Sequence, residues 1–142
     1  MIAIIDYKAG NTGSVMNALN RLGVSSVITA DQAKIKLADA VIFPGQGRAG
    51  TAMKELQRTG LDTLIPSLSQ PFLGICLGMQ LLASNSEEDT TRCLDVIPGS
   101  CRKFPSRLKT PQFGWNKVTL TKESPLTKSI ASGQYFYFLN SL

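Results

Sequence analysis

Cys76 stands at the centre of the segment Gly74-Ile75-Cys76-Leu77-Gly78, between a short apolar run and a pattern with helical spacing. A nucleophile elbow needs small residues two positions on either side of the nucleophile, because its sharp strand-to-helix turn leaves no room for side chains there. The turn would raise the sulfur above the sheet, near backbone N–H groups that favour the reactive thiolate. A buried structural cysteine beside two packing glycines is the alternative. The strand pattern before the cysteine and the helix pattern after it favour the elbow.

A second glycine-rich turn, Pro44-Gly45-Gln46-Gly47, follows the apolar run at residues 40–43. Glycines let a backbone N–H approach a substrate oxygen closely, because no Cβ stands in the way. One donor from this turn and one from Leu77, the residue after the cysteine, would form an oxyanion hole. The turn alone would equally fit a plain connection between a strand and a helix. A dinucleotide-binding fingerprint fits worse, because the third glycine of its spacing is absent.

Gln80 follows Cys76 by four residues, one helical turn along, so its amide is expected on the same face as the nucleophile. There it would hydrogen-bond an amide-bearing substrate, although a polar surface residue fits the spacing as well. The other two cysteines, Cys93 and Cys101, lack flanking glycines. We expect them to be inert.

The elements expected around these motifs alternate between short apolar strands and amphipathic helices. Strands are predicted at residues 2–6, 24–28, 40–43 and 71–75, and helices at residues 11–22, 51–58 and 76–82. This alternation is typical of an α/β fold with a mostly parallel sheet and helices on both faces. Ligands of such sheets gather at the carboxyl ends of the strands, where both glycine turns lie. Beyond residue 85, further strands are predicted at 117–121 and 135–138.

Length and composition fit one domain. The chain has 142 residues, 43% of them hydrophobic and 18% charged, which suffices to close a core without disulfides or metals. No apolar run is long enough to cross a bilayer, and the first residues lack the basic region of a signal peptide. We therefore expect a cytoplasmic protein with no membrane role.

Charge and residue types narrow the function classes further. The net charge of +5 comes from 15 Lys and Arg against 10 Asp and Glu, and the basic residues are scattered. We expect no nucleic-acid binding, since docking an anionic face of a partner protein explains the excess equally well. The three cysteines make no disulfide framework. The absence of histidine removes the commonest zinc ligand and the commonest general base, and we expect no metal site.

These motifs resemble a known family. Residues 74–80, with Pro44–Gly47 upstream, are similar to the class I (triad) glutamine amidotransferases, and closer still to the glutaminase subunits of imidazole glycerol phosphate synthases. Other landmarks of that group follow in family order at residues 5–11, 97–99, 111–116, 124–126 and 135–138. The resemblance implies a flavodoxin-like class I amidotransferase fold, as one glutamine amidotransferase domain over residues 1–142, and no cofactor.

The resemblance also implies a chemistry. Cys76 would attack the side-chain amide of glutamine, form a γ-glutamyl thioester and release ammonia. The backbones of Gly47 and Leu77 would supply the oxyanion donors. The residues that would hold the glutamine are Gly45, Gln80 and the backbone of Ser141 and Leu142. The ammonia would pass to a separate cyclase subunit, a (β/α)8 barrel that forms a heterodimer with the glutaminase in histidine biosynthesis.

The sequence departs from the family in several places. The family's His-Pro-Glu segment, which carries the general base, is not found, and the chain stops just after an apolar strand. We therefore expect the domain to be C-terminally incomplete and this 142-residue chain alone to be inactive. Asn140 and Gln112 stand where the family often has histidine, and Gln46 and Arg48 are less usual in the glycine turn.

Three alternatives remain open on the sequence alone. A catalytically inactive protein with the amidotransferase fold would serve as a binding partner of a synthase. A paralogue would send ammonia to another acceptor. A different cysteine enzyme on a related sheet would need an acidic residue from an early strand, for which Asp6 is the only candidate.

Overall fold

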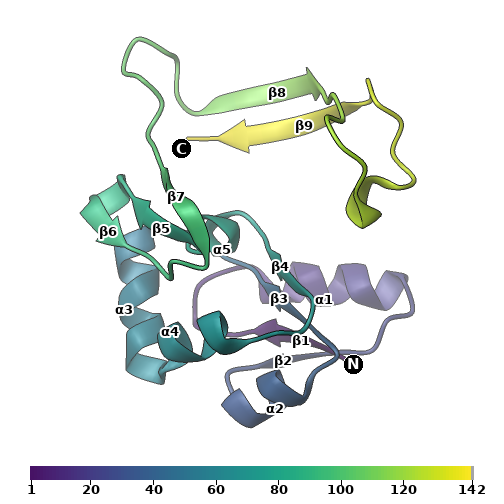
Figure 1. The fold of residues 1–142 in the computed structure, drawn as a ribbon, viewed down its shortest axis with the longest axis vertical. Helices are drawn as coiled ribbons and strands as arrows, with labels where there is room; N and C mark the ends of the chain where they lie inside the picture. The colour runs from purple at the N-terminus through teal and green to yellow at the C-terminus, as the bar shows by residue number, and fades with distance from the viewer. Residues whose placement is uncertain (142) are drawn as a thin grey trace. The chain divides into compact units, whose positions relative to one another are not determined.

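The computed structural model describes residues 1–141, which divide between Arg102 and Lys103 into two compact units (Figure 1). The first unit contains both glycine turns and all three cysteines. The sequence predicts one domain over residues 1–142. That single domain stays a prediction.

A four-stranded parallel sheet organises the first unit. Its strands are β1 (Ile2–Ile5), β2 (Ser26–Thr29), β3 (Ala40–Phe43) and β4 (Phe72–Gly74), in the order β2-β1-β3-β4. Ile4 of β1 lies between Ile28 of β2 and Ile42 of β3. Such aliphatic, mostly β-branched side chains favour a strand that is buried on both faces. All four predicted strands are present: β3 has the predicted bounds, and the ends of the others differ by at most two residues.

Four helices connect these strands, and a fifth, α5, follows β4. They are α1 (Thr12–Arg21), α2 (Gln32–Leu37), α3 (Ala49–Thr59), α4 (Leu61–Leu64) and α5 (Leu77–Gln80), with a 3-10 turn, η1 (Ile65–Ser67), after α4. Of these, α2 and α4 were not predicted as helices. Gly60 adopts a left-handed conformation between α3 and α4, which allows the second helix to begin directly after the first.

Helices cover both faces of the sheet because successive strand residues point to opposite faces. On one face Ile5, Val41 and Phe43 pack in a large buried cluster with residues of α2, α3, α4 and α5. On the other face Ile4 and Ile42 pack against Leu19 of α1. The predicted fold class, a mostly parallel α/β sheet with helices on both faces, is confirmed.

A second, three-stranded sheet follows α5. It consists of β5 (Ala83–Ser86), β6 (Thr91–Arg92) and β7 (Ile97–Cys101), with β5 parallel to β7 and antiparallel to β6. The predicted helix at 76–82 is too long, because Leu82 already belongs to the approach to β5: its carbonyl accepts from the N–H groups of Val96 and Ile97. Between β5 and β6 lies a 3-10 turn, η2 (Glu88–Thr90).

The second unit contains an antiparallel hairpin and a 3-10 turn, η3 (Pro125–Thr127). Its strands are β8 (Gln112–Lys117) and β9 (Tyr135–Asn140). The predicted strand at 117–121 is wrong in position. The pairing ends at Val118, whose N–H donates to Gln134 and whose carbonyl accepts from Gly133, and this closes the connection there.

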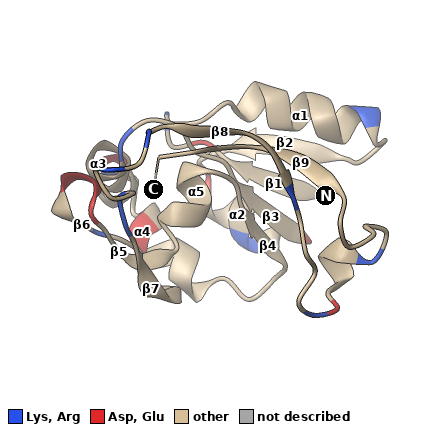
Figure 2. Ribbon diagram, turned by 90° about the horizontal axis from the view of Figure 1, so that it is seen from above, with Lys and Arg blue, Asp and Glu red and all other residues tan. Residues whose placement is uncertain are grey.

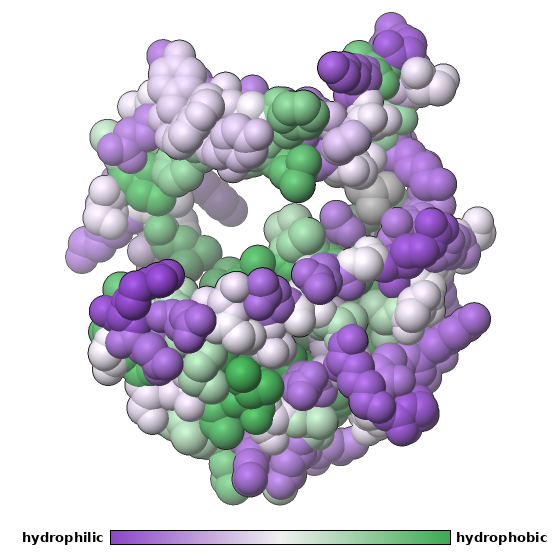
Figure 3. All heavy atoms as spheres, turned by 180° about the vertical axis from the view of Figure 1, so that it is seen from behind, coloured by the Kyte–Doolittle hydropathy of each residue, from purple (hydrophilic) through white to green (hydrophobic). Residues whose placement is uncertain are grey.

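Charge and hydropathy are mixed over the surface. Basic and acidic residues occur together on α3, while the last turn of α1 carries a basic residue and η2 an acidic group (Figure 2). Hydrophilic and hydrophobic side chains alternate on the face shown in Figure 3. Among residues 1–141, no helix combines the length and the apolar character needed to cross a membrane.

Candidate active site

Cys76 lies between β4 and α5 with backbone angles of φ 54° and ψ −120°. A residue with a Cβ rarely adopts a positive φ, and such a conformation costs about 1–3 kcal/mol. Two hydrogen bonds hold the turn: Ile75 N–H donates to the Phe43 carbonyl, and Gly78 N–H to the Ile75 carbonyl, each at 3.0 Å. Cys76 itself is exposed. The predicted sharp turn is present, and it has the geometry of a nucleophile elbow.

The glycines on either side of Cys76 lie where no side chain fits. A Cβ on Gly74 would lie 2.7 Å from the Cα of Met79, and a Cβ on Gly78 would overlap the carbonyl oxygen of Phe43. Both obstacles are backbone atoms, which cannot swing aside as the end of a side chain does. Neither position can therefore accept a side chain, as the sequence predicts.

The helix after the cysteine is shorter than predicted. A helix of four residues carries only a small macrodipole, so the dipole expected at Cys76 from the sequence is small in the structure. Leu77 occupies the first helical position, where an N–H has no partner within the helix. The N–H of Gln80 donates to the Cys76 carbonyl at 3.1 Å, which places Gln80 one turn on, as its spacing predicts. Its role in holding a substrate stays a prediction.

The glycine loop, Pro44–Gly47, leads from β3 to α3 and packs against the elbow with its first half. A Cβ on Gly45 would lie 2.6 Å from the nitrogen of Gly78 and 2.9 Å from the Cβ of Leu77. The structure therefore brings Gly45 into contact with the elbow. Gly47 differs: it is exposed, has a φ of 96°, and would present a Cβ to open space. It borders an open hollow of about 430 Å³ beside the loop.

Tyr7, just after β1, was missed by the sequence reasoning. It is 1% exposed, and its hydroxyl oxygen lies 2.5 Å from the point where a Cβ on Gly45 would be. Within residues 1–141 this hydroxyl has no hydrogen-bond partner. Burial, and then the neighbouring Cys76, raise the pKa of Tyr7. The available signal was its place at the carboxyl end of a central strand, the edge that also carries both glycine turns.

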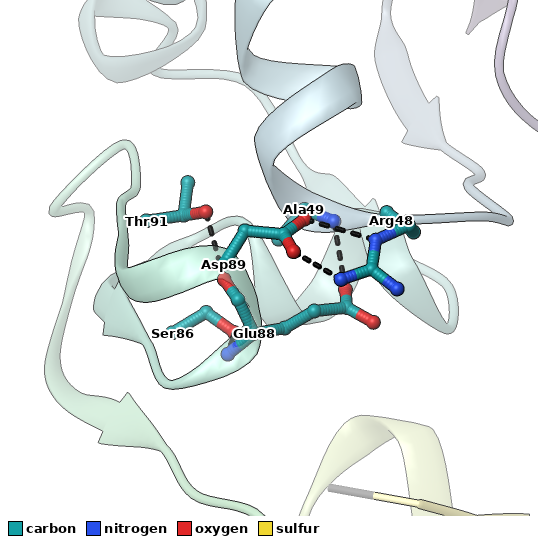
Figure 4. Close-up of polar contacts among 6 residues, drawn as sticks. All are labelled: Arg48, Ala49, Ser86, Glu88, Asp89 and Thr91. Atoms are coloured by element: carbon teal, nitrogen blue, oxygen red, sulfur yellow. Dashed lines mark hydrogen bonds and ion pairs between the residues drawn. The ribbon is translucent and has the colours of Figure 1, made fainter.

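Arg48, the residue after the glycine loop, is paired with the turn between β5 and β6 (Figure 4). Its Nε donates to a carboxylate oxygen of Asp89 at 3.1 Å, and its Nη2 contacts the other oxygen. The next residue, Ala49, donates its N–H to the Glu88 carboxylate at 2.7 Å. Hydrogen bonding to Asp89 raises the pKa of Arg48. The sequence analysis did not predict this pairing.

The other two cysteines have surroundings that disfavour reaction. Cys93 is buried, and burial, followed by the nearby Cys101, raises its pKa from 9.0 to about 11. Burial also raises the pKa of Cys101, whose thiol donates to the carbonyl of Gln80 at 3.6 Å. A thiol with a raised pKa is mostly protonated near neutral pH, and the protonated form is a poor nucleophile. These surroundings support the expectation that both are inert.

Ser141 follows the last paired residue of β9. The ladder ends at the pair Gln112 and Asn140, and the next residue of β8 would be Pro111, which has no N–H to donate. Ser141 belongs to the second unit, and its predicted part in holding glutamine stays a prediction. Leu142 lies outside the described residues.

The profile of the family described as "Glutamine amidotransferase class-I" matches residues 3–137. This chain belongs to the class I glutamine amidotransferases. A protein of Maridesulfovibrio salexigens named "Imidazole glycerol phosphate synthase subunit HisH" is 47% identical, over 99% of this chain and 72% of its own length. A protein of the same name from Bacteroides thetaiotaomicron is 46% identical with the same coverage.

A solved structure titled "Crystal structure of glutamine amidotransferase" shares the fold with a TM-score of 0.73. It covers 98% of this chain and 71% of its own length, at 16% sequence identity. The amidotransferase fold predicted from the sequence is therefore confirmed. Within this amidotransferase, the strained elbow at Cys76 and the glycine loop packed against it form the candidate active site.

Proposed function

We infer that this chain is the glutaminase subunit of an imidazole glycerol phosphate synthase, which releases ammonia from glutamine for a cyclase subunit in histidine biosynthesis. Relatives of that name at 42–47% identity over 99% of the chain support this function. The observation that carries the chemistry is the positive φ of Cys76 in an elbow that a second glycine segment contacts. A protein that only binds a partner gains nothing from a strained, exposed cysteine, so this geometry favours the enzyme over the inactive binding partner.

In the proposed reaction the Cys76 thiolate attacks the carbon of the glutamine side-chain amide. A C–S bond forms, and the electron pair of the carbonyl moves to its oxygen. The N–H groups of Gly47 and Leu77 would donate hydrogen bonds to this oxyanion. When the carbonyl re-forms, the C–N bond breaks and the nitrogen leaves as ammonia after taking up a proton. Water then releases glutamate from the γ-glutamyl thioester and restores the thiol.

The remaining groups have binding roles in this proposal. Gly45 and Gln80 lie beside the elbow and would contact the amide and the backbone of the glutamine, together with Ser141 and Leu142. The 142 residues contain no histidine, so no histidine of this sequence serves as the base that protonates the leaving nitrogen and activates water. The nucleophilic half of the reaction is the half that these residues support.

The partner in this proposal is a cyclase subunit with a (β/α)8 barrel, bound as a heterodimer. The exposed side chains of Leu73, Ile75 and Met79 surround the elbow and offer an apolar surface for such contact. A nucleophilic cysteine needs a reducing compartment to remain a thiol, and the three cysteines are free in the described part of the chain. We place the reaction in the cytoplasm on this ground.

Formation of the acyl-enzyme tests the proposal directly. The purified chain is mixed with L-glutamic acid γ-para-nitrophenyl ester, whose leaving group departs without protonation. We expect one equivalent of para-nitrophenolate in a burst and a matching mass increase on the peptide that contains Cys76. Cys76→Ala should show neither signal. A burst of equal size from Cys76→Ala would refute the assignment of the nucleophile.

A further inference from the structure

The glycine loop is held at both of its ends, but by different groups. At the first end Gly45 is buried against Gly78, Leu77 and the Tyr7 hydroxyl. At the other end Arg48 and Ala49 are bound by Asp89 and Glu88. Between these anchors Gln46 and Gly47 are exposed, and a Cβ on Gly47 would contact nothing. The peptide group between Gln46 and Gly47 is therefore the part of the loop with room to turn.

The second anchor is a turn built to approach α3. We call residues 86–91 the acidic turn. Ser86 Oγ accepts from the Glu88 N–H at 3.1 Å, and Thr91 Oγ1 donates to the Glu88 carbonyl at 2.8 Å. Asp89 and Thr90 both have positive φ, of 56° and 48°. Two successive residues in this conformation are unfavourable and persist only where the surroundings hold them.

The N-terminal turn of α3 has space for the acidic turn and an N–H group that is unpaired within the helix. A Cβ on Gly50 would lie 3.1 Å from a carboxylate oxygen of Asp89, so the glycine leaves space for the turn. The side chain of Arg48, at the N-cap position of α3, makes no capping hydrogen bond, and the Glu88 carboxylate caps the first N–H instead. The negative charge of this carboxylate also interacts favourably with the positive end of the helix dipole.

We propose that Asp89 and Arg48 are positioning residues for the oxyanion hole: their ion pair fixes the end of the glycine loop and thereby the direction of the Gly47 N–H. This rests on the proposed function, in which Gly47 is an oxyanion donor. Neither side chain touches the substrate in this proposal. Arg48 lies one residue from the donor, so a change in its position is transmitted through a single peptide unit.

The test compares two reactions of the same sulfur. Acylation of Cys76 by the γ-para-nitrophenyl ester passes through a tetrahedral oxyanion and needs the donors. Alkylation by iodoacetamide is a displacement at carbon that forms no oxyanion. A variant that only loosens the fold or alters access to Cys76 changes both rates together, whereas a misdirected Gly47 N–H slows acylation alone.

The variants are Asp89→Asn, Arg48→Ala and their combination. Each single variant should slow the acylation burst roughly two- to fivefold, the range for an exposed ion pair, and leave alkylation unchanged. The double variant should be no slower than either single one, because both remove the same pair. Arg48→Lys, which keeps the charge, should restore part of the rate.

A matched control is present on the same helix. Arg58 and Glu55 form an ion pair near the other end of α3, with exposures of 60% and 22% against 65% and 31% for Arg48 and Asp89. Glu55→Gln should leave both rates unchanged. If Asp89→Asn acylates at the parent rate, or loses acylation and alkylation equally, the positioning role is overturned. Gly47→Ala distinguishes a failure of the proposed function from a failure of the positioning role. If Gly47→Ala also acylates at the parent rate, Gly47 is not an oxyanion donor, and the proposed function is what fails.

Discussion

The hydroxyl group of Tyr7 packs directly onto the α-carbon of Gly45, so closely that a Cβ on the glycine would lie 2.5 Å from the oxygen. This contact joins the end of β1 to the glycine loop behind the nucleophile. Because the hydroxyl is buried without a hydrogen-bond partner in the described residues, it costs stability where it lies. Its position near Cys76 makes Tyr7 a residue to test.

Tyr7→Phe should raise the free energy of unfolding by about 1 kcal/mol, because it removes a buried unsatisfied hydroxyl and keeps the ring packing against Phe43. Urea denaturation followed by circular dichroism measures the change. Tyr135→Phe, at an exposed site in β9, is the control and should be neutral. A loss of stability in Tyr7→Phe would mean that the hydroxyl has a favourable partner in solution.

Gly45→Ala should destabilise the protein by about 1–3 kcal/mol, because the new methyl group overlaps the Tyr7 hydroxyl, the Gly78 nitrogen and the Leu77 Cβ. Combining it with Tyr7→Phe removes one of these three overlaps. The double variant should therefore lose less than the sum of the two separate effects predicts, as measured in a double-mutant cycle. Strict additivity would contradict the contact.

Gly47→Ala should slow acylation by the nitrophenyl ester by roughly tenfold to a hundredfold, toward the range seen when an oxyanion donor is lost. The backbone strain of alanine at positive φ must be separated from this effect. Gly23 provides the match, with φ 69° and nothing within 4 Å of a Cβ, at the end of α1. Gly23→Ala should lose similar stability and acylate at the parent rate. Equal slowing in both variants would indicate strain alone.

Raising the pH should destabilise the fold through Cys93. Its pKa is raised from 9.0 to about 11 by burial, so the unfolded chain releases this proton at a lower pH than the folded chain does. Stability is therefore retained below pH 9 and lost progressively between about pH 9 and pH 11. Denaturation midpoints measured across this window should fall less steeply in Cys93→Ala. Tyr7, whose pKa is also raised, contributes to the remaining slope above its ordinary value of 10.0.

The 142-residue chain should release ammonia from glutamine at a negligible steady rate, even though Cys76 acylates with an activated ester. The reason is that its sequence has no histidine to protonate the leaving nitrogen or to activate water. A coupled glutamate dehydrogenase assay measures the ammonia. Many turnovers per chain would show that another group performs both proton transfers.

The sharp turn at Cys76 was predictable from the sequence because its steric requirement is local. Glycines two residues on either side of Cys76 report a turn that excludes side chains, and this information lies within five residues. The same is true of the four central strands, whose runs of Ile, Val and Phe allow little else. The length of α5 was not predictable, since its end depends on hydrogen bonds from Val96 and Ile97 to Leu82.

Contacts between distant segments could not be predicted. Nothing near Arg48 in the sequence indicates that Asp89, 41 residues later, pairs with it. The sequence places Tyr7 just after the strand predicted at residues 2–6, but only its packing against Gly45 shows where its hydroxyl lies. The helix α2 did have a local signal that went unused: Asp31 accepts from the N–H groups of Ala33 and Lys34 as an N-cap.

The position of β4 has a consequence for handling the protein. In the part of the chain that the structure describes, β4 pairs only with β3, so it is an edge strand, and Leu73 and Ile75 on and beside it are exposed. Such an edge offers unpaired backbone groups to a second molecule, as in the early steps of aggregation. The strand that leads to Cys76 is thus also one that is open to pairing with a second molecule. In concentrated solutions, molecules should associate through this edge. Light scattering should therefore rise with protein concentration at temperatures well below the unfolding transition.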